Sequence, residues 1–167
     1  MALSGLSTLG ITFGYGVEAT AGTKPATFNQ LTRINQISEV SVEPEKIDAS
    51  ALEDTETKNV AGRATVTDTL TVTVNLTPET QAEWETLISA AATAKASGLK
   101  VWFEAIVPGL TKTSGDPAVS TQQAFFVIAE PPTSIPQPSL DQNGLLTVEM
   151  NCTVNEYKSV MDAVTLS

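Results

Sequence analysis

The side chains of this chain that could do chemistry are mostly carboxylates. Two pairs stand close together in the sequence, Glu43 with Glu45 and Glu53 with Asp54. Two carboxylates are enough for glycoside hydrolysis, but such sites usually lie in aromatic-lined clefts, and aromatic residues make up 5% of this chain. The pairs also lack the fixed order of oxygen ligands and the glycine turn of a calcium loop. We therefore expect neither a hydrolase site nor a calcium site.

Histidine is absent from the sequence, and Cys152 is the single cysteine. The chain alone cannot form a Ser-His-Asp or Cys-His nucleophile, or a zinc site made of histidine or paired cysteine. The sequence has no glycine-rich phosphate loop either. Cys152 belongs to an alternating apolar pattern, which predicts a small buried hydrophobic residue. We therefore expect a protein that is not an enzyme and needs no cofactor.

The formal net charge of −10 disfavours ordinary DNA or RNA recognition, because the chain repels phosphate. The acidity could simply maintain solubility, or it could suit a surface beside DNA that must not adhere to it. No basic residue precedes Lys24, and no apolar run reaches the length of a membrane span. These features predict a protein that is cytosolic when made.

The length of 167 residues and the hydrophobic content of 41% suit one domain spanning 1–167. Threonine, at roughly one residue in seven, favours β-sheet. The best strand signal is Thr65 to Leu76, where apolar residues alternate with threonines. Asp68 interrupts the apolar side of this pattern. Either that end of the strand lies beyond the core, or Asp68 is paired.

Further strands are predicted where apolar residues alternate or cluster, and one helix is predicted by its spacing. The strands are 33–42 (with a bulge), 99–107, 124–129 and 145–154. Thr77 and Pro78 begin a helix at 78–97 in which Trp84 and Leu87 share an apolar stripe, and Gly98 ends it. Three long loops remain, at 43–64, 108–121 and 130–143. Loops of this length are usually functional or disordered.

Several segments, in this order, resemble the major tail tube proteins of long-tailed, siphophage-type bacteriophages. These are the Gly16–Thr23 stretch with its Glu-Ala-Thr-x-Gly-Thr character, the strand ending in Ile37–Ser41, the loop motif Glu45–Thr55, the threonine-rich strand 65–76, the helix 78–97 and the Trp102-Phe103 strand. The match covers nearly the whole chain as an ordered pattern.

The resemblance implies a mainly β fold of two packed antiparallel sheets, sandwich or barrel-like, with one flanking helix. It also implies hexameric rings that stack into a hollow tube in the virion tail. Tape-measure protein would fill the lumen during assembly, and DNA would pass through it later without specific binding. Tail terminator and distal tail or baseplate proteins would lie at the ends.

The resemblance further assigns two sets of residues. The long loop would reach a neighbouring subunit through Glu43, Pro44, Glu45, Ile47, Asp48, Ser50, Leu52, Asp54 and Glu56. Candidates for the lumen wall are Thr67, Thr69, Thr71, Thr73 and Glu149. Two alternatives stay open: a tail terminator or other β-protein of the virion, and a non-enzymatic β-sandwich module that binds a ligand.

Overall fold

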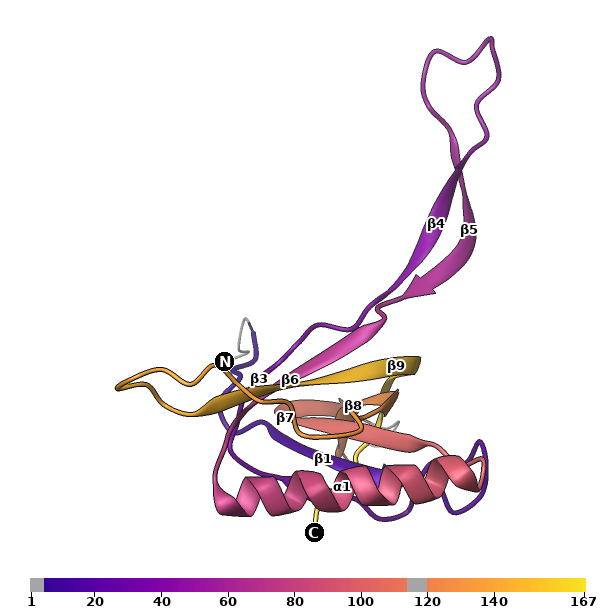
Figure 1. The fold of residues 1–167 in the computed structure, drawn as a ribbon. Coiled ribbons are helices and arrows are strands. Elements are labelled where there is room, and N and C mark those ends of the chain that lie inside the picture. The colour runs from indigo at the N-terminus through magenta and orange to yellow at the C-terminus, as the bar shows by residue number, and fades with distance from the viewer. Residues whose placement is uncertain (1–4, 114–119) are drawn as a thin grey trace.

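A computed structural model describes residues 5–113 and 120–167. Within them, a seven-stranded sheet, a two-stranded ribbon and one helix are formed, and neighbouring strands are antiparallel throughout (Figure 1). The elements are β1 (Thr12–Val17), β2 (Asn29–Leu31), β3 (Ile34–Ile37), β4 (Val42–Asp48), β5 (Asn59–Val66), β6 (Thr69–Asn75), α1 (Pro78–Ala96), β7 (Val101–Thr113), β8 (Ser120–Glu130) and β9 (Thr147–Asp162). The predicted mainly β fold with two antiparallel sheets and one helix is confirmed. The second sheet is the β4–β5 ribbon, which projects away from the body.

The large sheet has the strand order β2-β1-β7-β8-β9-β6-β3. Its two edge strands, β2 and β3, are consecutive in the chain and are separated only by Thr32 and Arg33. A connection this short spans roughly 10 Å, so the sheet must curl until its edges approach each other. Arg33 adopts a positive φ of 57° at this turn. The sheet is therefore barrel-like without being closed, since the described β2 and β3 do not pair.

The main core lies on the concave side of the curled sheet. Apolar side chains from β1, β2, β6, β7, β8 and β9 meet there with Trp84 and Leu87 of α1, both of which are fully buried. Thr77 caps the helix, because its Oγ1 accepts a hydrogen bond from Thr80 N at 3.2 Å, and Gly98 follows its end with a φ of 72°. The helix predicted at 78–97 is confirmed, and it ends one residue earlier.

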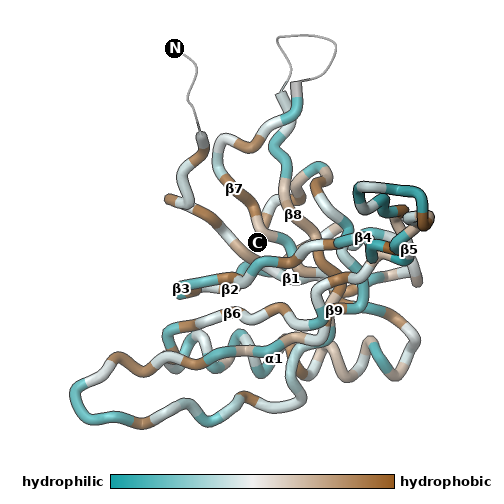
Figure 2. Tube along the Cα trace, turned by 90° about the horizontal axis from the view of Figure 1, so that it is seen from above, coloured by the Kyte–Doolittle hydropathy of each residue, from teal (hydrophilic) through white to brown (hydrophobic). Residues whose placement is uncertain are grey.

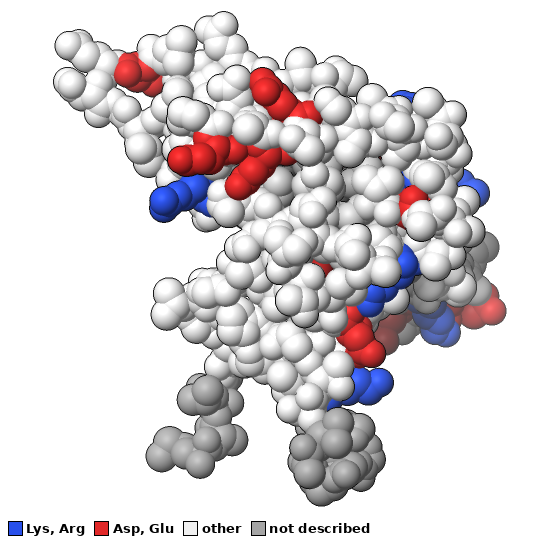
Figure 3. Space-filling model, turned by 90° about the horizontal axis from the view of Figure 1, so that it is seen from below, with Lys and Arg blue, Asp and Glu red and all other residues white. Residues whose placement is uncertain are grey.

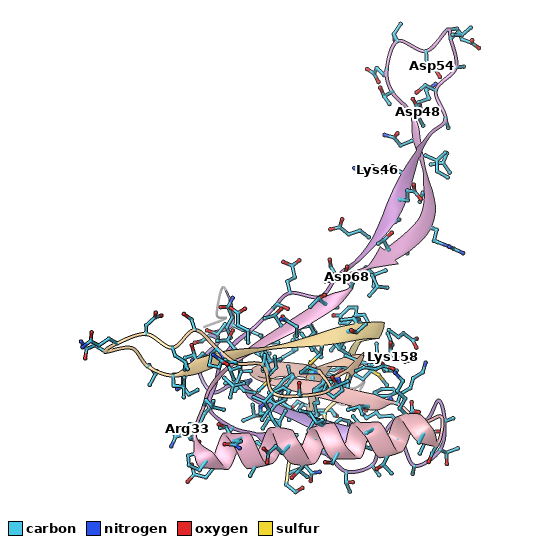
Figure 4. The ribbon with its side chains drawn as sticks, in the orientation of Figure 1. Arg33, Lys46, Asp48, Asp54, Asp68 and Lys158 are labelled. Carbon is cyan, nitrogen blue, oxygen red and sulfur yellow. The ribbon has the colours of Figure 1, made fainter. Side chains whose placement is uncertain are left out.

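The strand predicted from Thr65 to Leu76 is divided in the structure. Its second half is β6, with Leu70, Val72 and Val74 buried in the core, while the part before Asp68 belongs to the ribbon. Asp68 is exposed between the two strands, at the base of the ribbon (Figure 4). The first alternative for Asp68 is therefore confirmed: this end lies beyond the core.

The inner strand β1 was not predicted, because Gly14 and Gly16 interrupt the alternation of apolar and polar residues that indicates a strand. A Cβ on Gly14 would lie 2.6 Å from Asn29 O, and one on Gly16 would lie 2.7 Å from Thr27 O. Both glycines therefore let the neighbouring backbone approach β1 closely. The bulge predicted in the strand near Arg33 is present, between Ile34 and Gln36.

The prediction of a loop at 43–64 is wrong, because most of these residues belong to strands β4 and β5. Only residues 49–58 form the connection between the two strands. Both faces of the ribbon meet solvent, so no alternation of apolar and polar residues marked it as a strand. The loop predicted at 108–121 is also largely strand, because β7 continues to Thr113 and β8 begins at Ser120; its tip, 114–119, is outside the described residues. Residues 131–146 contain no helix or strand, in agreement with the loop predicted at 130–143.

Candidate self-association surfaces

The β4–β5 ribbon, residues 42–66, is here called the arm. Its strands pair from Val42 opposite Val66 to Asp48 opposite Asn59, and every residue of β4 is exposed. It extends far from the body and has no third strand (Figure 1). A two-stranded hairpin with neither face covered is at best marginally stable in water. The arm therefore has the form of an element that gains its packing from another chain.

The tip of the arm, residues 49–58, is ordered by its own hydrogen bonds. Ser50 N donates to Asp48 Oδ1 at 2.9 Å, and Lys58 N donates to Ser50 Oγ at 2.8 Å. Ala51 N donates to Asp54 Oδ2 at 2.7 Å, and the Lys58 ammonium lies 2.6 Å from Asp54 Oδ1. Asp48 and Asp54 both lie at the far end of the arm (Figure 4). These contacts define the conformation of the tip.

The two tip aspartates are stabilised in their charged form. The Ser50 side chain and its backbone N–H hold the pKa of Asp48 below its ordinary value. The Lys58 side chain, followed by the Ala51 N–H, holds the pKa of Asp54 below its ordinary value. Hydrogen bonds to a carboxylate favour its ionised form. Ionisation of the two carboxylates therefore favours the hydrogen-bonded conformation of the tip.

Apolar side chains on the arm face solvent. Ile47 and Val60 are directly opposite each other on the two strands and are 53% and 56% exposed. Ile47 leans over Gly62, where an added Cβ would lie 2.9 Å from Ile47 Cδ1. At the tip, Leu52 has a relative exposure of 106%, so the side chain touches almost nothing in its own chain. Apolar residues held this far from the core are typical of a docking surface.

The structure places the predicted inter-subunit residues together on the arm. Those on β4 are Glu43, Pro44, Glu45, Ile47 and Asp48, and those at the tip are Ser50, Leu52, Asp54 and Glu56. Two reciprocal hydrogen bonds between Ser41 and Thr67 hold the base of the arm. Thr67 N donates to Ser41 O at 3.0 Å, and Ser41 N donates to Thr67 Oγ1 at 3.0 Å. Thr67, predicted for the lumen wall, is therefore part of the arm's attachment.

The other residues predicted for the lumen wall share one polar face of the sheet. Thr69, Thr71 and Thr73 of β6 alternate with its buried apolar residues, and Thr73 is directly opposite the exposed Glu149 of β9. Thr71 Oγ1 donates to Asn151 Oδ1 at 2.8 Å. This face is polar, and Glu149 is the ionisable residue among these five. Its chemistry suits contact with solvent more than a packed interface.

A second projection corresponds to the long loop predicted at 130–143, for which the sequence indicated no specific contact residues. Residues 131–146 form a long loop that extends beyond the strand ends (Figures 1 and 2), and its Leu140 and Leu145 are 68% and 75% exposed. The sequence has four prolines in this region, but it has no periodic pattern that would predict exposed leucines available for contact with another chain. The loop is a further candidate for contact with another chain.

Two buried glutamates accept hydrogen bonds, whereas Glu104 Oε2 and Trp84 Nε1 are buried without a hydrogen-bond partner among the described residues. Glu18 Oε1 accepts from Trp102 Nε1 at 2.8 Å, and Glu104 Oε1 accepts from Val164 N at 2.7 Å. Burial raises the pKa of Glu104 above its ordinary value and raises the pKa of Cys152 to about 12. Cys152 is fully buried, which confirms its predicted place in the core.

Within residues 5–113 and 120–167, no group of three or more His, Cys, Asp or Glu side chains is placed to hold a metal ion. Over the same residues, no helix combines the length and apolar character needed to cross a membrane.

Comparison with known proteins found similarity at the level of structure. No family model and no curated protein sequence matches this chain. A similar solved structure is a chain in the cryo-EM structure of the anti-feeding prophage (AFP) baseplate, 6-fold symmetrised. The two chains share 12% sequence identity with a TM-score of 0.59, and the similarity covers 97% of this chain and 98% of that chain. The two chains therefore share a fold along nearly their whole length.

Proposed function

We propose that this chain is a structural, non-catalytic protein of a phage-type tail, and that it associates with copies of itself as a subunit of a tail tube. The observation that carries the proposal is the arm: a solvent-exposed ribbon with exposed apolar residues on its strands and at its tip, and with neither face covered by the described residues of its own chain. The shared fold with a chain of a prophage baseplate supports the same class of protein.

The proposed assembly is a six-membered ring that stacks on further rings. Six-fold symmetry is that of the baseplate structure that contains the similar chain. The arm projects from one side of the body, so a contact between the arm of one copy and the body of its neighbour joins two different surfaces (Figure 1). Heterologous contacts of this kind close into rings or continue into filaments. The subunit would be made in the host cytoplasm and function in the virion tail.

The polar face of β6 and β9 is the proposed lumen wall. Threonine and asparagine side chains with Glu149 among them offer no cluster of basic groups to which DNA could adhere. Tape-measure protein would occupy the same lumen before DNA passes. Terminator and distal tail or baseplate proteins would contact the end rings.

A second candidate function is a baseplate or tail terminator component of the same fold, which is favoured by the presence of the similar chain in a baseplate. Tube subunits polymerise beyond one ring, whereas a terminator stops at a single ring. Electron microscopy of concentrated protein distinguishes the two by the presence of tubes or of uniform rings.

The arm can be shortened without disturbing the body. Residues 45–63 are replaced by Asn-Gly, which leaves Pro44 opposite Ala64 in their present register and supplies a two-residue hairpin turn. The Ser41–Thr67 pair remains in place. We expect a folded monomer with cooperative thermal unfolding like that of the full chain, and no rings or tubes by negative-stain microscopy. Assembly that persists without the arm would contradict the proposed role of the arm.

A further inference from the structure

A groove lies between the second half of α1 and the chain that follows β8. Its volume is about 190 Å3. This is roughly the volume of six liquid water molecules, so it can hold an aliphatic side chain. The apolar residues that line it are Ile88, Ala91, Ala92, Leu99, Val101, Pro131 and Pro132. Val101 is buried and the other six are at least partly exposed, so most of the apolar lining meets solvent.

The rim of this groove is basic. Lys95 and Lys100 line it, together with a single acid, Glu130. The Lys95 ammonium lies 3.6 Å from Glu130 Oε2, but both side chains are largely exposed, at 74% and 47%, so the pair holds Lys95 only weakly. Figure 3 shows that most Lys and Arg side chains on the helix side of the molecule lie on the right, where Asp and Glu side chains are interspersed with them, and that the largest group of Asp and Glu side chains lies elsewhere, at the upper left.

The arm tip has the complementary chemistry. Leu52 is its fully exposed apolar side chain, and Glu53 directly follows it in the sequence. Glu53 and Glu56 make no ion pair within the described residues, where Lys58 is paired with Asp54. One uncovered leucine with two available carboxylates therefore matches one apolar groove with two lysines at its rim.

The positions of tip and groove allow repetition. The arm leaves the body from the β6 side, and α1 lies on the side away from it (Figure 1). A copy placed above in the same orientation presents its helix side to the arm below. In the resulting pair, the groove of the lower copy and the tip of the upper copy are still free, so the same contact can be repeated with further copies.

A second groove, near the base of the arm, fits the tip less well. It has a volume of about 270 Å3 and is lined by Val40, Leu70, Phe125 and Tyr157 among others. None of the described residues that line it is charged, so it offers no counter-charge to Glu53 or Glu56.

We propose that the arm tip of one copy docks into the groove between α1 and Pro131–Pro132 of a second copy, with Leu52 in the apolar groove and Glu53 and Glu56 beside Lys95 and Lys100. The inference rests on the proposed function, because it names the surface that receives the arm.

Charge reversal tests this pairing. The reversed-tip variant is E53K/E56K, which leaves the Asp54–Lys58 pair in place, and the reversed-groove variant is K95E/K100E. Each alone should need a protein concentration on the order of 10- to 30-fold higher to assemble, because two weak attractions become repulsions. An equimolar mixture should assemble at close to the wild-type concentration, since every contact in an alternating assembly then joins opposite charges. Thermal unfolding of each variant checks that its body is folded.

A cross-link gives an independent test. L52C combined with A92C should form disulfides between copies and give a ladder of covalent multimers on a non-reducing gel. Cys152 is buried, with its pKa raised to about 12, so it does not compete. The matched control is L52C with A82C, an exposed alanine of the same helix outside this groove, which should give little ladder.

The outcomes separate the two proposals. If the wild-type chain assembles, but the mixture of the two charge-reversed variants does not and L52C with A92C gives no ladder, the groove assignment is overturned. The proposed function is unaffected by that result. Cross-linking of L52C to F125C in place of A92C also overturns it, because the tip would then occupy the other groove. A wild-type chain that never assembles overturns the proposed function itself.

Discussion

Leu52 is the residue whose truncation should separate assembly from folding most cleanly. Its side chain is 106% exposed, so Leu52→Ala removes no contact from the monomer. The hydrogen bonds that order the tip come from Asp48, Ser50, Asp54 and Lys58, and they remain. The monomer should therefore unfold at the wild-type temperature.

The expected loss in assembly follows from the carbon atoms removed. Leucine to alanine deletes three carbons, and at about 0.8 kcal/mol for each buried methylene the contact loses about 2.4 kcal/mol if docking buries the side chain fully. Because each added copy makes one such contact, the protein concentration needed for assembly should rise about 50-fold.

Sedimentation velocity over a dilution series measures that concentration directly. Leu52→Met keeps the apolar volume and is the matched control; it should assemble within a few-fold of wild type. The reasoning is refuted if Leu52→Ala assembles at the wild-type concentration, since the leucine then stays in solvent in the assembled state.

Three further predictions concern the pH dependence and the backbone. Lys58 lowers the pKa of Asp54 below its ordinary 3.8, so the pair stabilises the tip at higher pH, and this contribution is lost as pH falls through the lowered pKa. Assembly of the wild-type chain, followed by light scattering, should weaken over that range. Assembly of Asp54→Asn should lack this pH-dependent step. Burial raises the pKa of Glu104 above its ordinary 4.5. The contribution of Glu104 to stability therefore favours folding below pH 4.5 and is lost as pH rises through the raised pKa. The free energy of unfolding, measured by urea denaturation, should fall over this pH range in wild type and stay flatter in Glu104→Gln. Gly14→Ala should cost about 1–3 kcal/mol of stability, because its Cβ would meet Asn29 O at 2.6 Å; a wild-type denaturation midpoint would show that β2 can move aside.

The elements that bury one face were predictable from the sequence. The helix at Pro78–Ala96 follows from its Thr77 cap and the spacing of Trp84 and Leu87, and β6 follows from alternation in which each second residue is buried. Both signals arise because one side of the element meets the core and the other meets solvent.

The arm and β1 did not give such a signal, for opposite reasons. The arm meets solvent on both faces, so its residues are free of the alternation that marks a half-buried strand. β1 is covered closely enough by neighbouring backbone that Gly14 and Gly16 replace the larger residues typical of strands. The groove on α1 could not be predicted either, since Lys95 and Pro131 come together only through the fold.

Negative-stain electron microscopy of the purified, concentrated chain tests self-association most directly. The proposed function predicts hollow tubes of stacked rings formed by this protein, alone or on addition of tail extract, whereas single uniform rings would favour the terminator. A chain that remains monomeric in both conditions would contradict it.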